Sequence, residues 1–98
     1  QVTDAGLKEV GKLKKLTYLS LYDAKFTNVG LKELTELKHL TGLDLEQCRL
    51  FTDAGLEELS KLKKLTYLDL RRTRTSKAGV DELRRALPKC NILHHVKD

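Results

Sequence analysis

Residues 62–70 read LKKLTYLDL, and residues 13–21 read LKKLTYLSL, the same nine residues with one substitution. A third version, LKHLTGLDL, occupies residues 37–45. In each copy the leucines are spaced by three residues, again by three, and finally by two. Spacing of three to four predicts a helix with one buried stripe, whereas spacing of two predicts a short strand with one buried face. Each copy therefore predicts the place where a helical segment gives way to a strand.

A tetrad with glycine in third place recurs along the whole chain. Its glycines follow one another at intervals of 24, 25 and 24 residues and are Gly6, Gly30, Gly55 and Gly79. A fixed period of this length is typical of a solenoid. We therefore predict one α/β solenoid domain over residues 1–98, with parallel strands on one side and helices on the other. Its 3.5 to 4 repeats have approximate bounds 2–25, 26–50, 51–74 and 75–98, the last being irregular or capping.

The repeat also predicts how neighbouring coils meet. A hydroxyl residue stands before each tetrad, where it can cap a helix, namely Thr3, Thr27, Thr52 and Ser76. A glycine in the first helical turn lowers helix propensity, so its recurrence indicates that a side chain there would collide with the neighbouring coil. Stacking in register buries the strand leucines. Small or hydrogen-bonding residues follow the strands, and two phenylalanines fill the gap before the next helix; these are Ala24, Cys48, Thr73, Phe26 and Phe51.

The strand segments match the pattern L-x-x-L-x-L, which resembles the leucine-rich-repeat family. The short period, the start Thr52-Asp53-Ala54-Gly55-Leu56 and the closing Leu87-Pro88-Lys89-Cys90 are similar to its cysteine-containing and ribonuclease-inhibitor-like branches. They also resemble bacterial proteins with tandem T-D-x-G-L repeats. The resemblance implies an arc with the strands on its concave side and the helices on its convex side. Members of the family mostly bind proteins, often through the concave strand residues.

Strand alternation predicts which side chains point outward on the concave side. Two tyrosines flank Gly42, where we expect a notch; an acidic row and a basic corner lie beside them. Tyrosine and arginine are enriched at binding hot spots, although any strand must place polar residues outward and tyrosine favours strands. The predicted partner-binding residues are Tyr18, Tyr22, Asp44, Glu46, Tyr67, Asp69, Arg71 and Arg72.

Composition weighs against other classes of partner. The net charge is +5, and the charged share of 34% is interleaved with leucine at helical spacing. That excess attracts nucleic acid only weakly, and no aromatic residues alternate with the lysines to stack on bases. No apolar run approaches the roughly 20 residues that cross a bilayer, so we predict no membrane insertion.

Catalysis and metal binding have little support in the sequence. His39 stands alone where the other repeats carry lysine, and Cys90, His94 and His95 fall short of the three or four ligands of a zinc site. No nucleophile can be paired with a base. We predict no enzyme activity, no cofactor and no metal. Cys48 and Cys90 are predicted to be buried thiols rather than a disulfide or metal pair, so they leave the cell compartment open.

The sequence therefore predicts a non-catalytic protein–protein interaction module that binds a protein partner through the concave strand face. The alternative is a structural segment of a longer solenoid that self-associates through its exposed ends. A third hypothesis, electrostatic binding of nucleic acid, is less well supported by the charge pattern.

Overall fold

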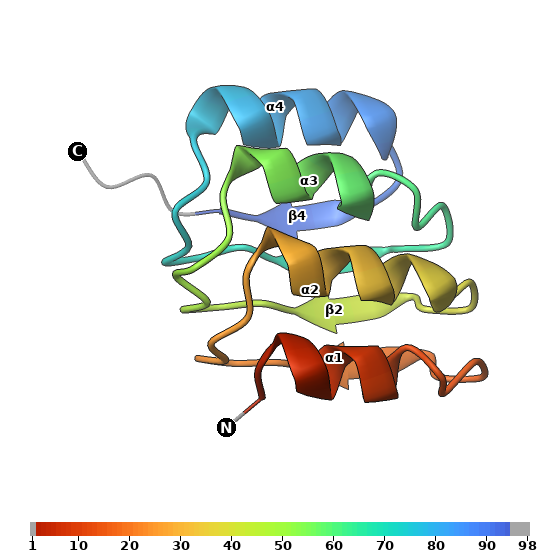
Figure 1. Cartoon of the computed structure of the whole chain (residues 1–98). Coiled ribbons are helices and arrows are strands. Elements are labelled where there is room, and N and C mark those ends of the chain that lie inside the picture. The colour runs from red at the N-terminus through yellow and green to blue at the C-terminus, as the bar shows by residue number, and fades with distance from the viewer. Residues whose placement is uncertain (1, 95–98) are drawn as a thin grey trace.

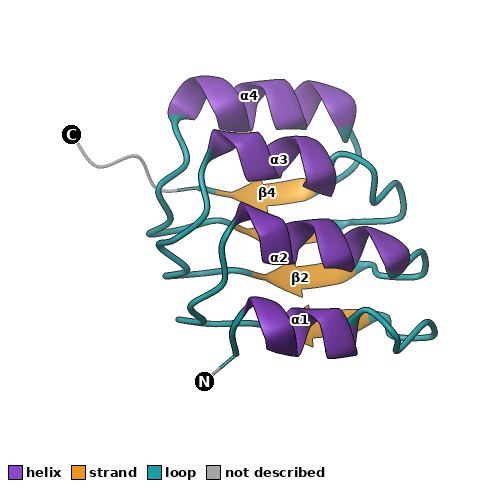
Figure 2. Cartoon of the chain, in the orientation of Figure 1, coloured by secondary structure: helices purple, strands orange, loops and turns teal. Residues whose placement is uncertain are grey.

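Four helix–strand coils stack side by side in the computed structural model, which describes residues 2–94 (Figure 1). The helices are α1 (Asp4–Val10), α2 (Asn28–Glu33), α3 (Asp53–Leu59) and α4 (Lys77–Ala86), with a 3₁₀ turn η1 (Leu34–Glu36) after α2. The strands are β1 (Tyr18–Ser20), β2 (Gly42–Asp44), β3 (Tyr67–Asp69) and β4 (Asn91–Leu93). They form one parallel sheet in the order β1-β2-β3-β4. Figure 2 shows the helices in a layer on one side of the sheet, which confirms the predicted solenoid.

The sheet register aligns equivalent leucines of successive coils. Leu19 pairs with Leu43, Leu43 with Leu68, and Leu68 with Ile92. Leu43 and Leu68 are fully buried because a coil covers them on each side. The last coil has no L-x-x-L-x-L segment, and its register could not be fixed from sequence. The structure gives Ile92 the leucine position, while Cys90 is half-buried against the core.

The helices are shorter than the leucine spacing predicts. Leu13 and Leu16 continue the three-residue spacing of α1 but lie in turns beyond its end at Val10. There the amide of Leu13 donates to the carbonyl of Val10, and the amide of Leu16 to that of Leu13, at 2.9 and 3.0 Å. Such three-residue turns repeat the side-chain spacing of a helix, so the pattern alone does not separate the two.

The predicted filling of the gaps between strand and helix is confirmed. Phe26 and Phe51 are fully buried, and their rings stack with centroids 5.5 Å apart. The Cys48 thiol donates to the carbonyl of Leu21 at 2.9 Å, and the Thr73 hydroxyl donates to that of Leu70 at 2.8 Å. The Cys48 bond thus joins two coils, whereas the Thr73 bond closes the turn of its own coil.

The extra residue of the second repeat falls in the loop between β2 and α3. Arg49 and Leu50 are both exposed there. The neighbouring strands keep their register, with Asp44 opposite Asp69. The loop therefore takes up the longer period of this repeat.

Capping of the helices differs from the prediction at two positions. Thr27 and Ser76 accept hydrogen bonds from the amides of Val29 and Gly79, as expected. Thr3 and Thr52 make no side-chain cap bond. The hydroxyl of Thr52 instead accepts from the side-chain amide of Asn28 at 3.0 Å. Those of Thr27 and Ser76 donate to an aspartate of the preceding coil and still accept the cap bond.

Three hydrogen-bonded pairs, which we term the cap pairs, join each coil to the next: Asp4 with Thr27, Asn28 with Thr52, and Asp53 with Ser76. Asp4 accepts from both the amide and the hydroxyl of Thr27, each at 2.7 Å. Asn28 accepts from the Thr52 amide at 3.0 Å and donates to its hydroxyl. Each pair gives a hydrogen-bond acceptor to a backbone amide at a helix start that has no partner within the helix, so it stabilises the coil that follows.

The cap pairs and the leucines explain the recurrent glycine. A Cβ on Gly55 would lie 2.5 Å from Leu31 Cδ1 and 2.6 Å from Asn28 Oδ1. A Cβ on Gly79 would lie 2.6 Å from the carboxyl carbon of Asp53. The predicted collision with the neighbouring coil is confirmed, and no glycine of the described chain adopts a positive φ.

Gly55→Ala should therefore destabilise the protein by about 1–3 kcal/mol, because the methyl group overpacks the junction between α2 and α3. Gly6→Ala is the matched control, since its Cβ would meet only Val2 Cγ1 at 3.3 Å. That substitution should be neutral or stabilising by up to about 1 kcal/mol through helix propensity. Urea unfolding followed by circular dichroism measures both. Equal effects of the two substitutions would contradict the account of the glycines.

Candidate functional site

The outward side chains of three strands and of the residues just after them form one surface. We call it the concave surface and define it by Tyr18, Ser20, Tyr22, Gly42, Asp44, Glu46, Tyr67, Asp69 and Arg71. Parallel strands lie about 4.8 Å apart, so equivalent side chains of neighbouring coils contact one another. Tyr18 and Tyr22 are 54% and 53% exposed, which is high for aromatic side chains. The structure thus brings most of the predicted site residues onto one face.

The notch predicted at Gly42 is filled. Gly42 is buried, and a Cβ built on it would lie 2.6 Å from Cδ1 of Tyr18. The ring of Tyr18 therefore leans over the glycine of the next strand. The absence of a side chain at Gly42 provides a seat for that ring.

Asp69 and Arg71 form the centre of the concave surface. The guanidinium of Arg71 donates through Nε to Asp69 Oδ1 at 3.0 Å and through Nη2 to Oδ2 at 2.7 Å. The backbone amide of Arg71 also donates to Oδ1 at 3.0 Å, and the Tyr67 hydroxyl reaches Oδ2 at 3.5 Å. Asp69 points outward as predicted but is only 1% exposed beneath these groups. Its carboxylate orients Arg71 and Tyr67, whereas the exposed Arg71 side chain can meet a partner.

The charges around Asp69 shift two pKa values. Burial acts to raise the pKa of the Asp69 carboxyl, but the hydrogen bonds and charge of Arg71 outweigh it and hold that pKa below its ordinary value of 3.8. Burial, followed by the carboxylates of Asp69 and Asp44, raises the pKa of the Tyr67 phenol. At neutral pH this centre therefore holds an ionised carboxylate and a neutral phenol.

Two further carboxylates lie next to this ion pair. Asp44 accepts from the Ser20 hydroxyl at 3.2 Å and from the Glu46 amide at 2.9 Å. Glu46 Oε1 lies 3.7 Å from Nη2 of Arg71. Ser20 was not among the predicted site residues, although the 24-residue offset of the repeat places it opposite Asp44. The predicted acidic row and Arg71 thus form one network.

Ligand oxygens of Asp44, Glu46 and Asp69 lie within 4.8 Å of one another. Hard cations take such oxygen ligands. The guanidinium of Arg71, however, already binds Asp69 in bidentate fashion and lies beside Glu46. A cation would have to displace Arg71, so the arrangement is that of an ion-pair network.

The third residue after each of the first three strands adopts a positive φ. The angles are 60° at Asp23, 66° at Gln47 and 61° at Arg72. Glutamine and arginine lack the tolerance of glycine or asparagine for this region, so these turns carry strain that the stack must offset. The amides of Asp23 and Gln47 donate to the carbonyls of Glu46 and Arg71 at 3.0 and 2.9 Å. Arg72 is exposed and reaches Gln47 Oε1 at 3.4 Å, at the rim of the concave surface.

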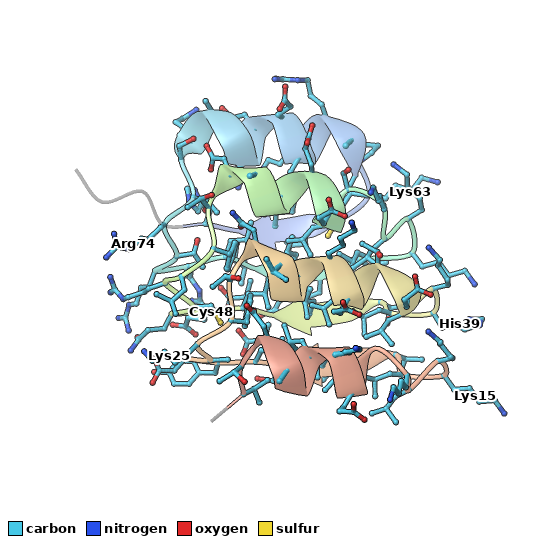
Figure 3. All side chains as sticks on the ribbon, in the orientation of Figure 1. Lys15, Lys25, His39, Cys48, Lys63 and Arg74 are labelled. Atoms are coloured by element: carbon cyan, nitrogen blue, oxygen red, sulfur yellow. The ribbon has the colours of Figure 1, made fainter. Side chains whose placement is uncertain are left out.

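The side chains of Cys48, Cys90, His39 and His94 lie outside this surface. Cys48 is buried, and burial raises the pKa of its thiol to about 11. Both cysteines are free. His39 is exposed, as predicted (Figure 3). His94 Nε2 lies 3.2 Å from the Thr75 hydroxyl, and His95 lies outside the described residues.

Basic side chains border the two loop edges of the solenoid. Figure 3 shows Lys15, His39 and Lys63 at the edge where helices lead into strands, and Lys25 and Arg74 at the opposite edge. Carboxylates accompany several lysines of the first edge. Lys14 lies 3.4 Å from Glu36, and other pairs join Lys12 to Glu9 and Lys61 to Glu58. These exposed pairs dilute the positive field that phosphate binding requires.

Comparison with known proteins defines the class of the chain. A family model described as a leucine-rich repeat matches residues 36–60. Among solved structures, a leucine-rich-repeat protein of Leptospira interrogans is similar, with 34% sequence identity and a TM-score of 0.69. The match covers 87% of this chain and 21% of that chain, so our sequence spans about a fifth of its length. No curated protein matches the sequence.

The chain is therefore a leucine-rich-repeat protein, which is the family that its L-x-x-L-x-L segments resemble. Solenoids of this class use extended concave surfaces for binding. Membership of the class accordingly suggests a protein-interaction module. No helix among residues 2–94 has the length and apolar character needed to cross a membrane.

Replacing Asp69 with asparagine should lower the free energy of unfolding at pH 7 by about 1.5–3 kcal/mol, because Arg71 loses its charged acceptor. The pKa of Asp69 is depressed in the folded state, so this stabilisation is present above pH 4 and is lost as pH falls through the lowered pKa. The difference between native chain and variant should therefore shrink toward pH 2. Urea unfolding at both pH values measures it.

Asp44→Asn is the control for this prediction. Asp44 lies opposite Asp69 in the sheet but receives its hydrogen bonds from uncharged donors. Its replacement should cost less at pH 7. An Asp69→Asn loss that stays constant down to pH 2 would contradict the role assigned to the ion pair.

Proposed function

We propose that this chain is a non-catalytic module that binds a protein partner through the concave surface. The binding unit is the single four-repeat domain predicted from the sequence. The supporting observation is the pair of half-exposed tyrosines, Tyr18 and Tyr22, beside the ordered network of Asp69 and Arg71. Exposed aromatic side chains next to an oriented arginine are typical of binding hot spots.

Order in the free protein favours this use of the surface. Arg71 is held by two side-chain hydrogen bonds, and the Tyr18 ring rests over Gly42. Side chains that are already fixed lose little conformational entropy on association. The residues that carry the proposal are Tyr18, Tyr22, Asp44, Glu46, Tyr67, Arg71 and Arg72, with Asp69 as the buried support.

Charge indicates the kind of partner segment that fits. The guanidinium of Arg71 lies 2.7 Å from Asp69 and 3.7 Å from Glu46, and a carboxylate oxygen of Asp44 lies within 4.8 Å of theirs. The centre of the concave surface is thus acidic within a chain of net charge +5. A partner segment with a basic side chain beside apolar or aromatic groups matches this centre, and complementary charge also speeds association.

The double variant Tyr18→Ser, Tyr22→Ser should lower the affinity for the partner at least about tenfold, because hot-spot aromatics contribute about 2 kcal/mol or more. Its thermal stability should stay close to that of the native chain, since both rings are half exposed. A matched control replaces Val29 and Leu50, which are exposed outside the concave surface, with serine.

The measurement is a pull-down from source-cell extract with and without nuclease, followed by titration of the captured protein. Binding should survive nuclease treatment and the control substitutions. Capture of the same proteins by the native chain and the tyrosine variant would refute the concave site. Loss of capture with nuclease would favour nucleic acid instead.

A further inference from the structure

Three basic side chains stand at equivalent positions of successive coils, at the edge of the solenoid where strands lead into helices. We call Lys25, Arg49 and Arg74 the basic column; each is the fifth residue after the end of its strand. All three are exposed, and Figure 3 shows Lys25 and Arg74 at the same edge. The basic column lies beside the concave surface but shares no residue with it.

Hydrogen bonds between coils hold the basic column in register. The amide of Asp23 donates to the carbonyl of Glu46 at 3.0 Å, in the turn before Lys25. The amide of Gln47 donates to the carbonyl of Arg71 at 2.9 Å, in the next turn. Neighbouring parallel strands lie about 4.8 Å apart, and these bonds carry that spacing beyond the strands. Three like charges therefore stand on adjacent coils.

Few carboxylates accompany these charges. The segments 23–26, 47–51 and 72–75 contain one acidic residue, Asp23, which lies 3.6 Å from the ammonium group of Lys25. Neither Arg49 nor Arg74 forms an ion pair within residues 2–94, whereas Lys14 at the opposite edge lies 3.4 Å from Glu36. Like charges on adjacent strand positions are destabilising. The basic column thus opposes folding and leaves two guanidinium groups available to an anion.

The extra residue of the second repeat adds an apolar group at the middle of the basic column. Leu50 directly follows Arg49 and is 50% exposed. The residues that follow Lys25 and Arg74 in the other two loops, Phe26 and Thr75, are buried. A half-exposed leucine next to arginine suits a partner that combines carboxylates with an apolar side chain.

A peptide supplies this combination better than a nucleic acid does. The planar guanidinium binds a carboxylate through two parallel hydrogen bonds. Single-stranded nucleic acid is held by base stacking on aromatic side chains as well as by charge. The aromatic residues of segments 23–26, 47–51 and 72–75 are Phe26 and Phe51, and both are fully buried. The column spans two strand spacings, about 10 Å, which about three residues of an extended peptide cover.

We propose that the basic column binds an acidic peptide segment of a partner protein, with Leu50 packing against an apolar side chain of that segment. The carboxylates of the segment pair with Arg49 and Arg74 and offset the repulsion within the column. This binding does not rest on the concave surface, whose centre is acidic and fits a basic side chain.

Fluorescence anisotropy with a short fluorescein-labelled peptide of glutamates around one leucine tests the proposal. At low salt the native chain should bind it with a Kd of about 100 µM or lower. The variant Arg49→Glu, Arg74→Glu should lower the affinity at least about tenfold, because two charge-assisted contacts become repulsive. Its Tm should be no lower than that of the native chain, since the like charges are removed.

Lys15→Glu, Lys63→Glu is the matched control, because it changes the net charge equally at the opposite edge (Figure 3). It should lower the affinity less than about twofold, since that edge is distant from the peptide. Leu50→Ser should lower it about threefold through lost apolar contact. The tyrosine variant Tyr18→Ser, Tyr22→Ser should bind the peptide as the native chain does, so failure of the concave site leaves this test unaffected.

Three outcomes would overturn the proposal. The first is a Kd above about 1 mM for the native chain. The second is an equal loss of affinity in the two double charge variants, which would indicate attraction by net charge alone. The third is tighter binding of single-stranded oligothymidylate or of phosphatidylserine vesicles than of the peptide, lost with Arg49→Glu, Arg74→Glu. That result would assign the basic column to nucleic acid or to a membrane surface.

Discussion

The burial of leucine between coils is the interaction on which the rest of the structure depends. No coil can cover its own strand leucines, because each coil presents one short strand and one short helix. Leu43 and Leu68 are fully buried only through the strands beside them. Each such side chain contributes about 1.5–3 kcal/mol. The glycines at the helix starts allow the close approach that this burial requires, and the cap pairs then fix the spacing of the helices.

Order on the concave surface follows from this stacking. Parallel pairing sets Ser20 beside Asp44 and Asp44 beside Asp69, so the polar groups of three coils meet without a loop to position them. The ion pair of Asp69 and Arg71 is made within one coil, but the carboxylate of Glu46 beside it comes from the preceding coil. The strained turns at Gln47 and Arg72 lie at the same edge, and their cost is offset by burial elsewhere. The core thus determines the geometry of the concave surface.

The sequence predicted the sheet, its buried leucines and the outward row. A two-residue alternation that recurs about every 24 residues determines which side chains of each strand face the core and which face outward. It overestimated the helices, since three-residue turns after Val10 repeat helical spacing. The cap pairs were missed because a local motif does not show that Asp4 reaches Thr27. The contact of Tyr18 with Gly42 was missed for the same reason, because side-chain direction between strands is a tertiary property.

The strand β1 forms one side of the concave surface. Tyr18 lies on this edge strand and Tyr22 just after it, so in the described chain both tyrosines are at the rim of the concave surface. Hot-spot residues generally lie near the centre of an interface, where surrounding contacts exclude water. A partner segment that crosses the strands from β1 to β3 would cover these tyrosines together with Arg71, because the parallel register sets the three coils side by side.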